Sequence, residues 1–362
     1  MSLDKVTVEN LLKTFIDPNV ETDLVSAKAI KKINVVDGDV SVTVELGYPA
    51  KSYLAELKAK LEAKLKTLAG VGTVNVEIVV NIVSHSVQKA LKPLPNVKNI
   101  IAIASGKGGV GKSTTSVNLA LALVAEGATV GILDADIYGP SIPTMLGLSG
   151  QPESDDGKSF KPKVSFGVQT ISIGYLVDAD QPMIWRGPMV TGALQQLLTQ
   201  TRWSNLDYLL IDLPPGTGDI QLTLAQQIPV SGAVIVTTPQ DIALIDAQRG
   251  LGMFEKVNVP ILGLVENMSI HICSQCGHEE AIFGQGGGVA MATKNRVDLL
   301  GSLPLDINIR QNADSGRPTL VADPEGRPAQ IYKEIARKMA AKLALRARDY
   351  SGRFPNIVIQ NT

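Results

Sequence analysis

Two patterns of hydrophobic residues follow one another along the chain, and the change between them divides it into two parts. In the first part, apolar residues recur at helical spacing over 8–15 and 52–68, and two runs rich in β-branched residues flank Asp37-Gly38. Asp-Gly between such runs is typical of a β-hairpin turn. With a further strand expected over 72–82, this part is predicted to be a small α+β domain.

This domain is predicted to span residues 1–82, and a proline-containing linker follows over 83–98. In the second part, short apolar strands alternate with helices, which implies a mostly parallel sheet with helices on both faces. Binding residues then belong at the carboxyl ends of the strands. This α/β domain is predicted over 99–349 and a C-terminal tail over 350–362. Its main strands are expected over 99–106, 129–136, 208–216, 232–239 and 260–268.

Two further segments need separate interpretation. Residues 150–170 are polar and are interpreted as an insertion between strands. Residues 329–350 are basic and amphipathic, with apolar residues at four-residue spacing from Ile331 to Leu343. Such a helix packs its apolar stripe against a sheet or lies on a membrane surface. The packed arrangement is the prediction here.

Composition narrows the class of protein. The chain of 362 residues is 44% hydrophobic and 19% charged, with a net charge of -1. This near-neutral balance argues against nucleic acid as a partner, because strong non-specific binding needs a basic surface. No apolar run is long enough to span a membrane, and the first residues lack the features of a secretory signal. We therefore expect a cytoplasmic protein with neither nucleic acid nor membrane as its partner.

A phosphate-binding loop occupies residues 106–114, "GKGGVGKST", between a predicted strand and a predicted helix. Glycines let the backbone N–H groups face the phosphates, and the helix N-terminus adds positive potential. Lys112 is expected to reach the β- and γ-phosphates, and the Ser113 hydroxyl to bind Mg²⁺. The predicted nucleotide-binding residues of the loop are Gly106, Lys107, Gly108, Gly109, Val110, Gly111, Lys112, Ser113 and Thr114.

Polar residues at three other strand ends extend this predicted site. Asp136 and Asp212 each follow an apolar strand, where a carboxylate can hold Mg²⁺ or orient an attacking water. Asp134 has either a structural or a catalytic role. Asn267, at a later strand end, contacts the nucleotide or caps a turn.

Cys273 and Cys276 are the only cysteines, and their spacing excludes a disulfide framework. A C-x-x-C pair supplies two thiolates, whereas thiolate metal sites usually have four ligands. The pair is read as a metal site completed elsewhere, as a redox dithiol, or as half of a zinc site shared by two chains. His271 and His278 leave little room for a single-chain Cys₂His₂ site. The nearby "GQGGGV" at 284–289 is either a phosphate turn or a flexible link.

The stretch "KGGVGKST" resembles the deviant Walker motif of the ParA/MinD-like P-loop ATPases. The resemblance implies that Lys107 reaches the phosphates of a partner subunit, so that the ATP-bound state is a homodimer. It also implies that Asp136 orients the attacking water, that Asp212 belongs to the Mg²⁺ site, and that Asn267 contacts adenine. The predicted catalytic residues are Lys107, Lys112 and Asp136, and hydrolysis is expected to be slow and Mg²⁺-dependent.

Further stretches are similar to the Mrp/ApbC family of iron–sulfur cluster carriers. These are residues 203–219, 234–250 and 265–269, together with "CSQCG" at 273–277 and "IFGQGGG" at 282–288. The N-terminal part resembles a domain of iron–sulfur assembly factors, although this copy has no cysteine.

The Mrp/ApbC resemblance implies an ATPase that holds a [4Fe–4S] cluster between two subunits and transfers it to apo-proteins. A two-fold axis would bring two copies of Cys273 and Cys276 together as four thiolates. Cluster scaffold proteins and apo iron–sulfur proteins are the expected partners. Two alternatives are a MinD/ParA-like positioning ATPase and an electron donor resembling the nitrogenase iron protein. The sequence identifies neither the cluster donor nor the recipients.

Overall fold

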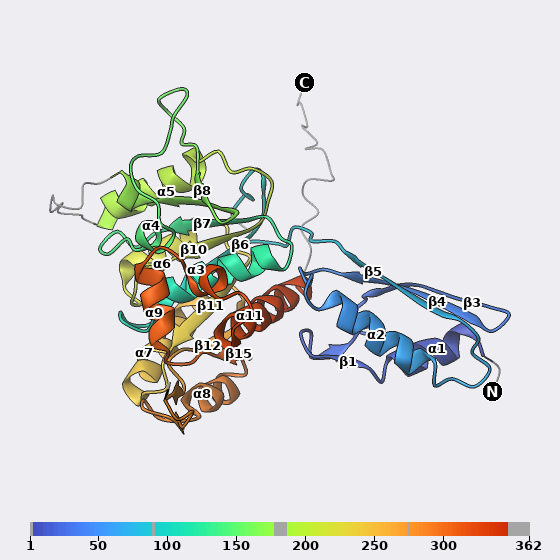
Figure 1. The fold of residues 1–362 in the computed structure, drawn as a ribbon. Helices are drawn as coiled ribbons and strands as arrows, with labels where there is room; N and C mark the ends of the chain where they lie inside the picture. Colours follow the sequence, from blue (N-terminus) through green and yellow to red (C-terminus); the bar gives the residue numbers. More distant parts are fainter. Residues whose placement is uncertain (1–2, 89–90, 177–186, 274, 347–362) are drawn as a thin grey trace, which may run out of the picture.

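The computed structural model describes residues 3–88, 91–176, 187–273 and 275–346. Figure 1 shows a larger α/β part and a smaller elongated part that extends from one side of it. The smaller part is the N-terminal α+β unit. The helices α3 (Lys112–Ala125) and α11 (Arg327–Ala344) of the larger part both run toward this unit (Figure 1).

The N-terminal unit is a three-stranded sheet with helices packed on it. Strand β4 pairs antiparallel with β3 and parallel with β5. The predicted hairpin turn is confirmed, since Asp37 (φ 50°) and Gly38 (φ 91°) both have positive φ. The elements are α1 Lys5–Leu12, β1 Ile16–Asp17, β2 Thr22–Asp23, β3 Ile30–Val36, β4 Asp39–Leu46, α2 Leu54–Leu65 and β5 Val74–Val80.

The larger part is built on an eight-stranded sheet of order β15-β12-β11-β6-β10-β7-β9-β8. All neighbouring strands are parallel except β8 and β9. The predicted fold class, a mostly parallel α/β sheet preceded by a small α+β unit, is confirmed. The strands are β6 Val97–Ala104, β7 Val130–Asp134, β8 Lys163–Ser165, β9 Val168–Ser172, β10 Leu206–Asp212, β11 Gly232–Thr237, β12 Ile261–Glu266 and β15 Leu299–Ser302.

Helices cover both faces of this sheet. Successive side chains of a strand point to opposite faces, and apolar residues of the strands pack against helices on each face. On β6, Ile101 and Ile103 pack in one apolar cluster with α3 and α11, whereas Ala102 packs in a second cluster with α5, α6 and α7. The helices are α3 Lys112–Ala125, α4 Ile142–Met145, α5 Gly187–Gln200, α6 Asp219–Gln227, α7 Asp241–Lys256, α8 Gly287–Asn295, α9 Ile307–Asp314, α10 Thr319–Ala322 and α11 Arg327–Ala344.

Two interpretations of individual segments can now be compared with the structure. The polar segment 150–170 is not only an insertion, because β8 and the first residues of β9 form a hairpin at the sheet edge. An edge strand needs few apolar residues, so its composition resembled a loop. Along α11, Ile335, Met339 and Leu343 are fully buried, and the predicted packed arrangement is confirmed. The predicted tail, 350–362, lies outside the described residues.

Candidate nucleotide and metal sites

The phosphate loop connects β6 to α3, and two of its glycines are required by their surroundings. At Gly106 an added Cβ would lie 2.2 Å from the backbone carbonyl carbon of Asp246 on α7. Gly111, directly before α3, has φ 81° and leaves no room for a Cβ beside the Asn267 amide. The loop therefore follows a path that places α7 on one side of it and the end of β12 on the other.

Two of the predicted residues, Lys112 and Ser113, contact the carboxylate of Asp212 at the end of β10. Lys112 Nζ lies 2.7 Å from Asp212 Oδ2 and 3.8 Å from Asp136 Oδ2. The Ser113 hydroxyl donates to Asp212 Oδ2 at 2.6 Å. Ser116 Oγ donates to Asp212 Oδ1, also at 2.6 Å. Sequence reasoning missed Ser116, although it stands one helical turn after Lys112.

Hydroxyl, ammonium and carboxylate groups are the groups that hold a nucleotide triphosphate with Mg²⁺. Asp212 is fully buried and Lys112 is nearly so, which strengthens their interaction because water does not screen it. The donor set of Lys112, Ser113 and Asp212 thus fits Mg²⁺ and phosphate chemistry. The start of α3 and the end of β10 supply this donor set.

Asp134, whose role was left open, is the last residue of β7 and is fully buried. It is opposite Asp212 in the register of β7 and β10. Burial, with the nearby charge of Asp212, raises the pKa of Asp134 to about 7. Its oxygens accept hydrogen bonds from the N–H groups of Asp136 and Ile142 and from Ser172 Oγ. Asp134 therefore fixes the loop that carries Asp136.

Asp136 itself is less deeply placed than Asp134. Burial raises its pKa, while the Lys112 ammonium acts in the opposite direction. The carboxylate lies beside the phosphate loop rather than within the core, at 9% exposure. This position suits a group that contacts both Lys112 and a solvent molecule.

Asn267 and Lys107 contact the loop in different ways. Asn267 Nδ2 donates to the Val110 carbonyl at 2.9 Å, so the amide braces the loop from the end of β12. Lys107 is partly exposed, and its carbonyl accepts from Ser105 Oγ at 2.9 Å. Among the described residues, the ion pairs of the loop are made by Lys112 and not by Lys107.

The cysteine pair sits in a small hairpin of β13 His271–Ile272 and β14 Glu279–Glu280. Its turn is tight: Cys273 N–H donates to the His278 carbonyl, and Gly277 N–H donates to the Cys273 carbonyl, both at 2.9 Å. Cys276 is exposed and Cys273 partly so. Hydrogen bonds from the backbone N–H groups of Gln275 and Cys276 lower the pKa of Cys273. A thiolate stabilised in this way, on a surface turn, fits a soft metal.

The histidines beside the pair have other contacts. His271 Nδ1 lies 3.1 Å from the Leu305 carbonyl, and His278 is exposed. Within the described part of the chain, no group of three or more His, Cys, Asp and Glu side chains is placed to hold a metal ion. The cysteine pair by itself offers two sulfur ligands.

At glycines 286–288, an internal carboxylate already binds one of the N–H groups that a phosphate turn would use. The Gly288 N–H donates to Glu266 Oε1 at 2.7 Å, and Ser302 Oγ donates to Oε2. Glu266 is buried at the end of β12, next to Asn267. It ties α8, which follows the cysteine hairpin, to the strand that braces the phosphate loop. Sequence reasoning did not single out Glu266.

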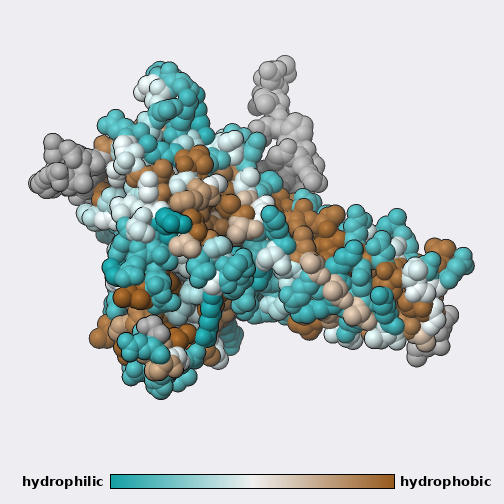
Figure 2. Space-filling view, in the orientation of Figure 1, coloured by the Kyte–Doolittle hydropathy of each residue, from teal (hydrophilic) through white to brown (hydrophobic). Residues whose placement is uncertain are grey.

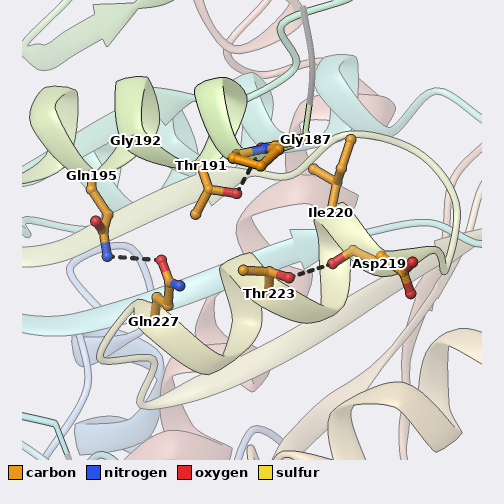
Figure 3. Close-up of a pocket in the computed structure, with 9 residues that line it drawn as sticks. Gly187, Thr191, Gly192, Gln195, Asp219, Ile220, Thr223 and Gln227 are labelled. Atoms are coloured by element: carbon orange, nitrogen blue, oxygen red, sulfur yellow. Dashed lines mark hydrogen bonds between the residues drawn. The ribbon is translucent and has the colours of Figure 1, made fainter.

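Two of the grooves formed by the described residues lie on the larger part, outside these sites. Figure 3 shows the first, about 570 Å³, between α5 and α6. Gln195 of α5 donates to Gln227 of α6 at 2.8 Å across it, and its lining among the described residues includes none of the predicted site residues.

The second groove, about 800 Å³, lies between α7 and α8 and has apolar walls that include Leu244 and Met291. Exposed Ile242, Ile245 and Val289 stand on the same two helices. Figure 2 shows apolar surface in this part of the molecule, at the lower left.

Comparison with known proteins gives consistent results over nearly the whole chain. The family model described as NUBPL iron-transfer P-loop NTPase (ParA) matches residues 96–340. A second model, described as iron-sulfur cluster assembly protein, matches residues 5–78.

Among individual relatives, the iron-sulfur cluster carrier protein of Escherichia coli K12 is 52% identical over 340 residues, covering 94% of this chain and 92% of that protein. The mouse iron-sulfur cluster transfer protein NUBPL is 50% identical over 254 residues, covering 70% of this chain and 80% of that protein.

Solved structures match the larger part. A nucleotide-binding protein from Archaeoglobus fulgidus, in complex with ADP, has a TM-score of 0.56 and 37% identity, and the match covers 64% of this chain and 90% of that one. The cell division ATPase MinD of Pyrococcus furiosus has a TM-score of 0.51 at 23% identity, covering 66% and 97% of the two chains. The second likeness is one of fold.

Proposed function

The chain belongs to the family of NUBPL iron-transfer P-loop NTPases, and from this premise we propose that it is an ATP-dependent carrier of iron–sulfur clusters. It takes a cluster from a scaffold protein and delivers it to apo-proteins in the cytoplasm, where thiols stay reduced. The observation that best supports the proposal is that one chain carries both a complete phosphate loop and an exposed two-thiolate turn. Relatives named as cluster carriers or transfer proteins support it too.

ATP binds at the start of α3 in this proposal. Lys112 and Ser113, which share Asp212, interact with the β- and γ-phosphates and with Mg²⁺. The metal supplies charge neutralisation when bound. In the same proposal, Asp136 orients the attacking water and the Asn267 side chain contacts the adenine. Hydrolysis is slow in one chain alone, because this chemistry depends on positioning and on a complete set of positive charges.

The homodimer is the second element of the proposal. Lys107 is partly exposed on the loop and is not engaged in the ion pairs around Asp212, so it is free to reach the phosphates of a partner subunit. A dimer of this kind has a two-fold axis, and a two-fold axis brings identical surfaces together.

The cluster is cargo rather than a resident cofactor. A [4Fe–4S] cluster usually takes four thiolates, and each chain offers Cys273 and Cys276. Two copies of the hairpin facing each other at the axis supply four. The N–H groups that stabilise the Cys273 thiolate would also stabilise the negative charge that four thiolates bring together. Exposure of Cys276 leaves a path for an acceptor protein to reach the cluster.

Anaerobic reconstitution with iron and sulfide tests this function. The wild-type protein should take up about one [4Fe–4S] cluster per dimer, measured by iron and sulfide content and by the visible spectrum. Cys273→Ala should take up none while still binding ADP. Gln275→Ala is the matched control, since it lies in the same turn and retains both thiolates. Zinc as the only metal that binds stably, or a cluster held by monomers, would contradict the proposal.

A further inference from the structure

The N-terminal unit contacts the C-terminal end of α3, the helix that begins at the phosphate loop. Helix α3 begins at Lys112 in the nucleotide site and ends at Ala125, with Glu126 as its C-cap residue. The Glu126 side chain is fully buried. Its carboxylate accepts hydrogen bonds from the Ser52 N–H at 2.9 Å and from Ser52 Oγ at 2.5 Å. In addition, the Lys51 N–H donates to the Glu126 carbonyl at 3.1 Å.

A second helix completes this contact between the N-terminal unit and the end of α3. We call the contact, made by Lys51, Ser52, Glu126 and Arg337, the joint. Arg337 of α11 donates from Nη1 to Glu126 Oε1 at 2.7 Å and to Ser52 Oγ at 2.9 Å. Its guanidinium group also lies 5.9 Å from the centre of the Tyr53 ring. Arg337 is 11% exposed and Glu126 not at all, so water screens the pair little. One arginine thus holds the cap of α3 and the start of α2 at the same time.

The buried carboxylate of Asp17 reinforces the N-terminal side of the joint. It accepts from the backbone N–H groups of Asn19 and Val20 and from the hydroxyls of Tyr48 and Tyr53. These bonds fix Asn19 and Tyr53, which both contact Arg337. Arg337 Nε donates to Asn19 Oδ1 at 3.4 Å, and its guanidinium group lies near the Tyr53 ring. The joint is therefore an ordered polar network rather than a loose surface contact.

Apolar packing continues across the same boundary. Core residues of α2, such as Leu61, belong to one continuous cluster with Leu123 of α3 and Met339 of α11. Farther along α11, Lys342 contacts Glu21 of the N-terminal unit at 2.7 Å and Asp298 before β15 at 2.9 Å. This second polar contact does not involve α3.

We propose that Glu126 is a positioning residue through which the docked N-terminal unit strengthens nucleotide binding at the other end of α3. The helix is about 20 Å long, and its residues from Thr115 to Leu123 are buried, so it moves as a rigid body. A shift at Glu126 displaces Lys112 and Ser113 relative to Asp212. Holding the far end in place preorganises the loop, which reduces the cost of binding.

The coupling is reciprocal, because each event must change the other by the same factor. Nucleotide at Lys112 therefore tightens the joint at Ser52. The inference concerns nucleotide affinity and depends only on the P-loop site, so it stands or falls independently of the cluster-carrying function.

The test compares the affinity of full-length variants for Mg-ADP, measured by calorimetric titration. Glu126→Gln and Arg337→Met should weaken binding by roughly 2- to 30-fold, the range for substitutions that modulate coupling between sites. Arg337→Lys should restore part of the loss. Lys342→Met is the matched control: it removes a contact between the same two parts, from the same helix, without touching α3, and its affinity should stay at the wild-type value.

Hydrogen exchange of the wild-type protein supplies a readout that needs no substitution. Exchange at the amides of Lys51 and Ser52, which donate to Glu126, should slow when Mg-ADP is added. Unchanged ADP affinity in both Glu126→Gln and Arg337→Met would overturn the proposal. An equal loss in Lys342→Met would overturn the role of Glu126, because docking as a whole would then carry the effect. Exchange at the joint that is indifferent to nucleotide would also count against it.

Discussion

At the scale of single residues, the nucleotide site shows how a buried carboxylate organises its neighbours without being exposed to solvent. Asp212 is fully buried and accepts from Lys112, Ser113 and Ser116. Asp134 lies next to it in register, and two carboxylates in such proximity disfavour double ionisation. The two aspartates therefore differ in character: Asp212 is paired with a cation, and Asp134 retains its proton to a higher pH.

This difference predicts a pH dependence for stability. The pKa of Asp134 is raised from 3.8 to about 7 in the folded protein, so the folded chain binds the proton more tightly than the unfolded chain. Its stabilising contribution is present below about pH 4 and is lost as the pH rises through 7. Asp134→Asn removes this dependence, so the wild-type free energy of unfolding should fall relative to the variant between pH 4 and 7.

Denaturant unfolding without nucleotide, at several pH values, measures this difference. Asp156→Asn is the control, because Asp156 is exposed and the N–H groups of Lys158 and Ser159 lower its pKa. Its stability difference from wild type should stay constant above about pH 5. A wild-type minus Asp134→Asn difference that is flat, or that rises, from pH 4 to 7 would show that Asp134 is ionised in the fold.

Several residues of the candidate site were predictable from the sequence, for a clear reason. The loop pattern fixes the neighbours of Lys112 and Ser113, and apolar runs that end in Asp136 and Asp212 place those groups at one sheet edge. Glu266 was not predictable, since its partner Gly288 is 22 residues away. A carboxylate at a strand end looks the same in sequence whether it binds a metal or a backbone amide.

At the scale of elements, local chemistry explains what could be predicted. The Asp37-Gly38 turn was predictable because both residues favour positive φ, and the structure has them there. Strand β8 was not, because it lies at the sheet edge and is short and largely solvent-facing. The joint at Glu126 could not be predicted either. Nothing in the sequence distinguishes this glutamate, which follows a helix, from an exposed one, and only the fold shows that the N-terminal unit covers it.

Contact between the phosphate loop and α7 predicts unequal effects for two glycines of one loop. A Cβ at Gly106 would lie within 2.6 Å of three backbone atoms of Asp246 and Ala247, whereas a Cβ at Gly108 meets nothing within 4 Å. Backbone atoms of a packed helix cannot move aside cheaply. Gly106→Ala should therefore lower the free energy of unfolding by about 1–3 kcal/mol or more.

Gly108→Ala is the matched control for that prediction. Its free energy of unfolding should stay within about 0.5 kcal/mol of wild type, as for most open positions. Thermal and denaturant unfolding of both variants without nucleotide make the comparison. Equal stabilities of the two variants would mean that the loop does not rest on α7 as the structure has it.

At the scale of the whole molecule, the two candidate sites and the joint occupy different ends of shared elements. Strand β12 connects them on one side: Asn267 after it braces the phosphate loop, and Glu266 within it holds α8 behind the cysteine hairpin. Helix α3 connects the loop to the N-terminal unit on the other side. A structural change in the nucleotide site is therefore connected through packed residues to α8 on one side and to the N-terminal unit on the other.

Dimerisation is the property of the whole molecule on which the shared cluster depends, and Lys107 provides its test. If the Lys107 ammonium reaches the partner's phosphates, ATP adds one cationic contact per site across the interface, and buried contacts of this kind are strong. In equilibrium sedimentation with Mg-ATP, the wild-type protein should associate into dimers, and Lys107→Ala should remain largely monomeric. Both should be monomeric without nucleotide.

Lys158→Ala is the control for the loss of one positive charge, since Lys158 is exposed on the 150–170 segment, away from the loop in sequence. It should dimerise like the wild type. Because Lys107 is outside the ion pairs around Asp212, Lys107→Ala should still bind Mg-ADP as a monomer, which separates lost association from lost binding. If Lys107→Ala dimerised with ATP as wild type does, the lysine would act within its own subunit, and the four-thiolate site would need another origin for its symmetry.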